Sequence, residues 1–153
     1  MNYKLIGDSC SDLDQRQLKS KHYLTVPLVL QIGSYHIADK NFDRKDFIKR
    51  MRESKVGAKT ACPSPEAFRK AYEDADADCI FVVTLSEHLS GTYQSAVLAK
   101  HMYEEEENAN KKVFVLSSHS ASAGQCRILL ELERLCELDL AYEEICERIT
   151  KFR

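Results

Sequence analysis

Short apolar runs alternate with amphipathic stretches along this chain of 153 residues. Runs rich in Leu, Ile, Val and Phe occupy residues 3–7, 24–32, 79–84 and 113–116, and each predicts a strand. The run at residues 79–84 is apolar nearly throughout, which is typical of a central strand that helices cover on both faces.

The stretches between these runs have the spacing of helices. A helix-compatible polar segment covers residues 14–21, and further helices are predicted to begin near residues 43, 64, 90, 124 and 142. Strands that alternate with helices predict an α/β fold: a mainly parallel sheet with helices on both faces, in a three-layer α/β/α arrangement. The apolar stripes of the later helices comprise Phe47, Ile48 and Met51; Ala67, Phe68, Ala71, Tyr72 and Ala75; Tyr93, Ala96, Val97, Ala99 and Met102; Ile128, Leu129, Leu132, Leu135 and Cys136; and Tyr142, Ile145, Cys146 and Ile149.

The pattern is less regular after the second predicted strand. A turn at Gly33 and Ser34 is expected to return the chain as a short hairpin arm at residues 35–38. Pro27 favours an edge or strand-start position, because proline has no N–H to donate to a neighbouring strand. Residues 55–65 contain glycine and two prolines, and they predict a loop.

Length and composition are those of an ordinary globular domain. A chain of about 150 residues is typical of one domain, and 44% hydrophobic with 30% charged residues excludes a collagen-like, low-complexity or largely disordered chain. The 22 Lys and Arg against 24 Asp and Glu give a net charge of -2. No whole-chain positive charge therefore draws the protein to nucleic acid or anionic lipid, and neither is expected as a partner.

The cysteines and histidines show no metal-binding pattern. No Cys-x-x-Cys pair occurs, and no histidine lies at zinc-ligand spacing, so no metal site is expected. The N-terminus lacks the apolar stretch of a signal peptide, and no run approaches the roughly 20 apolar residues that cross a bilayer. We expect a cytoplasmic protein without a transmembrane segment, with reduced thiols at Cys10, Cys62, Cys79, Cys126, Cys136 and Cys146.

Hydroxyl side chains gather in the loops that are expected beyond the carboxyl ends of the strands, where open α/β sheets bind ligands. We call these loops, at residues 8–12, 59–64, 85–92 and 117–124, the rim. The helix starts in two of them add free N–H groups, which favour a carboxylate or a phosphate. The hydroxyl residues of the last three loops are Thr60, Ser64, Ser86, Ser90, Thr92, Ser117, Ser118, Ser120 and Ser122.

Several rim residues also have a plain structural interpretation. On spacing alone, Ser90 is expected to be the N-cap of its helix, and Thr60 an ordinary loop hydroxyl. Asp8, Ser9 and Asp12 could start a helix or bind a cation, and the capping role is favoured.

His88 and His119 fall in two of the rim loops, where either could act as a base for a nearby serine. No Gly-x-Ser-x-Gly elbow is present to expose a nucleophile. Neither Gly-x-Gly-x-x-Gly nor a phosphate-binding loop occurs, which disfavours dinucleotide binding and nucleotide hydrolysis. The alternative function is therefore a small phosphotransfer or hydrolytic enzyme that uses His88 or His119 with a rim serine.

The rim motifs resemble those of the DegV family in order and spacing. The resemblance covers nearly the whole chain, and its most specific part is Leu-Ser-Gly-Thr-Tyr-Gln-Ser-Ala at residues 89–96. The other motifs are Asp-Ser-Cys-Ser-Asp-Leu at residues 8–13, Val-Pro-Leu at 26–28, Thr-Ala-Cys-Pro-Ser-Pro at 60–65, and the Ser-rich loop before Gly124.

The resemblance implies a fatty-acid-binding protein of two domains, with the lipid tail between the domains and no cofactor. Some members look like acyl-carrying subunits of a fatty acid kinase, so this chain is expected to be non-catalytic and to present a long-chain fatty acid to a kinase subunit. By motif, Thr60 and Ser90 would hold the carboxylate. The supporting residues would be Ser9, Gly91, Thr92 and Ser118.

Two rim positions depart from the family pattern: Ala61 and Ser117 stand where the family usually has Ser and Asp. The last predicted helix also has no stop signal at residues 151–153. Residues 1–153 are therefore expected to form a DegV-like N-terminal α/β domain, with the lipid-enclosing C-terminal domain absent from this chain. Alone, the chain is expected to fold but to bind fatty acid poorly or not at all.

Overall fold

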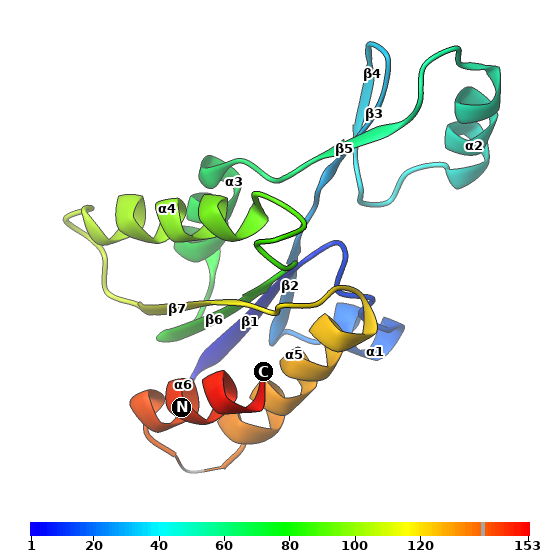
Figure 1. Cartoon of the computed structure of the whole chain (residues 1–153). Helices are drawn as coiled ribbons and strands as arrows, with labels where there is room; N and C mark the ends of the chain where they lie inside the picture. The colour runs from blue at the N-terminus through cyan, green and yellow to red at the C-terminus, as the bar shows by residue number, and fades with distance from the viewer. Residues whose placement is uncertain (139) are drawn as a thin grey trace.

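The computed structural model describes residues 1–138 and 140–153. Its main sheet is parallel and four-stranded, in the order β2-β1-β6-β7. The strands are β1 (Tyr3–Asp8), β2 (Tyr23–Val26), β6 (Cys79–Thr84) and β7 (Lys112–Ser117). Figure 1 shows α3 (Pro65–Asp74) and α4 (Thr92–Glu104) on one face, and α5 (Ala123–Cys136) and α6 (Tyr142–Phe152) on the other. The predicted three-layer fold is confirmed.

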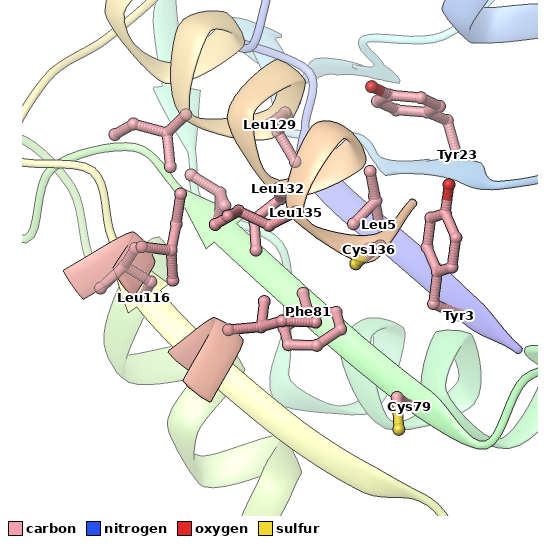
Figure 2. Close-up of a cluster of buried hydrophobic side chains, with 14 residues drawn as sticks. Tyr3, Leu5, Tyr23, Cys79, Phe81, Leu116, Leu129, Leu132, Leu135 and Cys136 are labelled. Carbon is pink, nitrogen blue, oxygen red and sulfur yellow. The ribbon is translucent and has the colours of Figure 1, made fainter. Parts of the chain in front are cut away.

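Two hydrophobic cores lie on opposite faces of this sheet, because successive side chains of a strand point to opposite faces. Leu5 and Phe81 face α5 and α6, whereas Ile6, Ile80 and Val82 face α3 and α4. Figure 2 shows the first core, in which Leu129, Leu132 and Leu135 of α5 lie over Leu5 and Phe81. Each fully buried side chain of this size contributes about 1.5–3 kcal/mol to folding. All six residues of β6 are buried, as expected for a central strand.

The prediction of one strand over residues 24–32 was wrong. β2 ends at Val26, and β3 (Val29–Ile32) belongs to a separate antiparallel sheet of order β4-β3-β5. Pro27 stands at the break, where it has no N–H to continue the ladder. The next residue, Leu28, donates its N–H to the Ser9 hydroxyl at 3.0 Å instead of to a strand. Apolar content alone could not reveal that the run changes sheets.

The second sheet contains one strand that was predicted and one that was missed. β4 (Tyr35–Ala38) is the expected hairpin arm, and it pairs with β3. β5 (Lys59–Ala61) lies within the predicted loop at residues 55–65, and it also pairs with β3. Its three residues show no apolar alternation, so no local pattern predicts a strand there.

Two shorter helices complete the structure. α1 (Gln15–Lys19) begins with a capping box formed by Asp14 and Gln17. α2 (Arg44–Glu53) begins at the N-cap Asp43, as predicted, but none of its residues is buried. Within the described ranges, no helix is both long and apolar enough to cross a membrane.

Candidate functional site: the rim of the parallel sheet

The buried polar side chains of the molecule gather where β1, β6 and β7 end. Three of the predicted rim loops, at residues 8–12, 85–92 and 117–124, follow these strands as expected. Polar groups are costly to bury, and their concentration at the carboxyl edge of an open α/β sheet marks a binding region. The side chains concerned are Asp8, Ser11, Thr84, Ser86, Thr92, Ser117, Ser118 and Gln125.

Asp8 ties two rim loops together. Its carboxylate accepts hydrogen bonds from the backbone N–H of Leu85, at 2.6 Å, and of Cys10, at 3.0 Å. The side chain is fully buried, and this burial raises the pKa of the carboxyl above its ordinary value. The predicted helix-capping role of Asp8, Ser9 and Asp12 was wrong, because the N-cap of α1 is Asp14.

Ser9 stabilises the junction between the two sheets, because its hydroxyl accepts the N–H of Leu28. It also lines a cleft of about 690 Å³ together with Leu13, Tyr23 and Phe42. Neither Thr60 nor Ser90 lines this cleft. This cleft is therefore not the place where the sequence predicts a carboxylate, and the chemistry of the rim guides the assignment instead.

Ser90 lies directly before α4. The N-cap of this helix is Gly91, which has no side chain, so the prediction that Ser90 itself is the N-cap residue was wrong. The Ser90 hydroxyl nevertheless accepts the N–H of Thr92 at 3.3 Å and lies 2.9 Å from the Thr92 hydroxyl. Thr92 is fully buried, whereas Ser90 is half-buried and Gly91 is exposed. A helix start with hydroxyls and no capping side chain suits an incoming anion.

The segment that carries Thr60 comes to the start of α4 from the antiparallel sheet. It lies in β5, opposite Leu30 of β3, and not after a strand of the parallel sheet as predicted. Two residues later, the Cys62 sulfur lies 3.9 Å from the Ser95 hydroxyl of α4. A Cβ atom on Gly91 would lie 3.4 Å from the same sulfur. The segment that carries Thr60 is therefore packed against the first turns of α4, and Thr60 itself is exposed.

Ser118 is placed at the rim, but its hydroxyl is used within its own loop. It donates to the backbone oxygen of Ser120 at 2.9 Å and accepts the N–H of that residue at 3.1 Å. Its own N–H donates to the Thr84 carbonyl at 3.0 Å, and the Ser86 N–H donates to the Ser120 carbonyl at 3.0 Å. Ser118 thus fixes the loop after β7 against the loop after β6.

The two rim histidines lie close together at the surface. Their ring centroids are 6.1 Å apart, and Nε2 of His119 lies 3.2 Å from Oε1 of Glu87. The pKa of Glu87 is lowered, first by its own backbone N–H and then by the neighbouring imidazoles. Across residues 1–138 and 140–153, neither imidazole forms a hydrogen bond with a serine hydroxyl. The serine–histidine pair that the alternative enzyme function needs is therefore not assembled.

Sequence reasoning missed Thr84 and Gln125, which are fully buried at this edge. The Gln125 side chain donates from Nε2 to the Val83 carbonyl at 3.1 Å, while its Oε1 and the Thr84 hydroxyl have no hydrogen-bond partner among the described residues. Gln125 continues the apolar stripe of α5 at a spacing of three and four from Ile128 and Leu129. A polar residue on the apolar face of a predicted helix indicates a buried polar contact, and this pattern could have identified Gln125 from the sequence.

Metal binding finds no support in the part of the chain that the structure describes. No cluster of three His, Cys, Asp or Glu residues in it could hold a metal ion. The six cysteines, all within the described ranges, are free.

The fold and this rim define an α/β domain whose hydroxyl-rich edge can accept an anion. The family model described as "Uncharacterised protein, DegV family" matches residues 2–153. The chain belongs to the DegV family.

Relatives of known name or structure agree with this assignment. A DegV domain-containing protein of Streptococcus pyogenes serotype M1 is 38% identical over all of this chain and 55% of its own length. A DegV family crystal structure from Ruminococcus gnavus with vaccenic acid is 37% identical, with a TM-score of 0.91 over 99% of this chain and 54% of that protein. The Fatty Acid Kinase (Fak) B3 protein of Streptococcus pneumoniae, loaded with linoleic acid, is 33% identical, with a TM-score of 0.87 over 99% and 54%. The chain thus spans about half the length of these relatives.

Proposed function

We propose that this chain binds a long-chain fatty acid and holds its carboxylate with the hydroxyls of Thr60 and Ser90. The observation that carries the proposal is the contact of Cys62 with Gly91 and Ser95, which brings the Thr60 segment against the open start of α4. A carboxylate there would gain charge-assisted hydrogen bonds from hydroxyl and backbone donors. The fatty acids in the related structures support this ligand class.

The supporting residues have separate roles in this proposal. Gly91 leaves room for the ligand beside Cys62 and presents the backbone of the helix start. Thr92 holds the Ser90 hydroxyl in place. Ser9 and Ser118 fix the loops on either side through the hydrogen bonds to Leu28 and Ser120. Ala61 donates no hydrogen bond from its side chain, so the carboxylate relies on Thr60 and Ser90.

We further propose that the chain is a carrier without chemistry of its own, and that it presents the acid to a fatty acid kinase. The related protein named Fatty Acid Kinase (Fak) B3 supports this partner. Hydroxyls that hold a carboxylate need no cofactor. The six free cysteines favour a reducing compartment, which supports the cytoplasm as its place of action.

The acyl tail is proposed to be enclosed largely by surface outside residues 1–153. Thr60 is exposed, Ser90 is half-buried, and neither lines the cleft beside Ser9 or the hollow on α2. In the longer relatives, a second region of comparable length is available to cover such an open rim.

Organic extraction followed by mass spectrometry tests the function. Protein that includes the remaining length of the relatives, incubated with oleic acid and then washed, should release that acid, and its Ser90→Ala and Thr60→Ala variants should release much less. Equal amounts from the wild type and both variants would overturn the assignment of the carboxylate ligands. Absence of bound acid even in a preparation that includes the remaining length of the relatives would overturn the function itself.

A further inference from the structure

The positive charge of this protein is concentrated in α2 and the residues directly after it. Residues 44–55 contain six Lys or Arg and two Asp or Glu, a net charge of +4. Since the whole chain carries -2, the rest of it carries -6. The net charge that disfavoured anionic partners therefore hides a strongly basic segment.

α2 also exposes apolar side chains. Ile48 and Met51 are 48% and 45% exposed, although the sequence pattern predicts that both lie on the apolar face of the helix. The opposite side of the stripe is occupied, because Phe47 packs on Phe42 with ring centroids 5.5 Å apart. Ile48 and Met51 are the unpartnered part of an amphipathic helix.

Basic residues flank the exposed apolar pair. Lys45, Ile48, Lys49 and Arg52 recur at helical spacing and, together with Glu53, line a shallow hollow of about 420 Å³ on one face of α2. Arg50, by contrast, is paired with Asp46 at 2.7 Å and lies over the Tyr35 ring at 4.3 Å. Lys45, Lys49 and Arg52 form no ion pair with any residue in the described ranges.

The position of α2 makes this face accessible. Figure 1 shows α2 at the end of the molecule beyond the β4-β3-β5 sheet, away from α5 and α6. A short link joins α2 to β5, the strand that carries Thr60. α2 and Thr60, one of the two proposed carboxylate-binding residues, are therefore close in the sequence.

We propose that α2 docks on an anionic phospholipid surface, with Lys45, Lys49 and Arg52 at the headgroups and Ile48 and Met51 in the boundary with the acyl chains. A bilayer offers negative charge directly above hydrocarbon, and this layering matches cations that flank an apolar pair. An acidic protein surface would satisfy the cations but leave Ile48 and Met51 without a matched partner. The benefit of docking rests on the proposed function, because fatty acids reside in bilayers.

Vesicle flotation of the full chain tests the proposal. Wild-type protein should float with vesicles of phosphatidylcholine and phosphatidylglycerol, less so at high salt, and should not float with phosphatidylcholine alone. The variant Lys45→Gln/Lys49→Gln/Arg52→Gln should bind about a hundredfold more weakly, at about fivefold for each cation near the surface. The control Arg16→Gln/Lys70→Gln/Lys151→Gln loses the same charge from α1, α3 and α6 and should bind as the wild type does.

A second variant and its control test what the apolar side chains of α2 contribute to vesicle binding. Ile48→Gln/Met51→Gln should weaken flotation about tenfold. Leu98→Gln/Leu130→Gln, which alters side chains 51% and 40% exposed on other helices, should not. Equal flotation of the α2 variants and their controls, or of the wild type on both vesicle types, overturns the proposal. No flotation at all also overturns it and favours an acidic protein as the partner of α2.

The same samples separate this proposal from the proposed function. Bound acid is extracted and measured for every variant, and the α2 variants should retain it in solution. Flotation that depends on α2 without any bound acid would contradict the proposed fatty-acid binding but not the docking surface. Bound acid without flotation would contradict the docking surface but not fatty-acid binding.

Discussion

Thr60 and Ser90 belong to separate parts of the fold, and the segments that carry them are in contact through Cys62. Thr60 lies in the antiparallel sheet, Ser90 precedes a helix of the parallel one, and Cys62 bridges the two segments at the start of α4. Within residues 1–138 and 140–153, neither hydroxyl forms a hydrogen bond with a residue far away in the sequence. Ser90 forms its hydrogen bonds two residues away, with Thr92, and remains half-buried.

Ser90→Ala should weaken fatty-acid binding by about 1.5–3 kcal/mol, because a hydrogen bond to a charged group is lost. Calorimetry with dodecanoic acid measures the change. Folding should change little, because Gly91 and not Ser90 is the N-cap residue. Thr150→Ala, which removes an exposed α6 hydroxyl that donates to the Cys146 carbonyl, is the control, and an equal loss in both variants would contradict the role of Ser90.

Asp8 makes stability depend on pH in a direction that can be tested. Burial raises the carboxyl pKa in the folded state, so the folded protein binds a proton more readily than the unfolded chain does. The free energy of unfolding of the wild type, relative to that of Asp8→Asn, should therefore fall as pH rises from about 4, near the ordinary carboxyl pKa, toward neutrality. Urea unfolding of both proteins across this range measures the difference. A difference that grows with pH would show that the two backbone N–H donors outweigh burial.

At the scale of elements, the periodic patterns were reliable where one environment extends along a segment. The strand at residues 79–84 was predicted because apolar cores cover both of its faces, and the α5 stripe at Ile128, Leu129 and Leu132 because it faces one of them. Pro27 indicated a strand start or an edge but not a change of sheet, and β5 depends on tertiary pairing with β3 and carries no local signal. The apolar stripe of α2 was predicted, but none of its residues is buried, because periodicity reveals a stripe and not its partner.

The loop between β7 and α5 leaves no space for a side chain at Gly124. A Cβ atom there would lie 2.9 Å from the Ser120 Cβ and would overlap the Ser120 hydroxyl. Gly124→Ala should therefore lower the free energy of unfolding by about 1–3 kcal/mol in urea titrations, and Ser120→Gly should restore part of the loss. Gly57→Ala is the matched control, because no atom lies within 4 Å of its added Cβ. Equal stability of the two alanine variants would contradict the packing of this loop.

At the scale of the whole molecule, the parallel sheet, its helices and its rim were predictable, while the route of Thr60 to the rim was not. The order of the motifs led to the proposal of Thr60 and Ser90, but the sequence has no signal for Cys62 packing on Gly91. The uneven distribution of charge was present in the sequence and was hidden by the net charge of -2. Because α2 lies at the end of the molecule, this basic segment is accessible to a partner (Figure 1).

The open rim predicts a weak dependence of affinity on acyl chain length. A methylene that becomes fully buried adds about 0.8 kcal/mol, or about fourfold in affinity. Because Thr60 is exposed and neither ligand residue borders a described hollow, most methylenes should stay outside residues 1–153. Calorimetry with octanoic, decanoic and dodecanoic acids should give much less than fourfold per methylene. A full fourfold step would show that this chain alone encloses the tail.

The most direct test of the carboxylate site is nuclear magnetic resonance of dodecanoic acid labelled at its carboxyl carbon. With the wild type and with the control Thr150→Ala, the labelled carbon should show a bound resonance displaced from that of the free acid, because hydroxyl and backbone donors surround the carboxylate. The double variant Thr60→Ala/Ser90→Ala should lose this displaced resonance while its circular dichroism stays that of a folded protein. A displaced resonance that persists unchanged in the double variant would contradict the central claim that these two hydroxyls hold the acid.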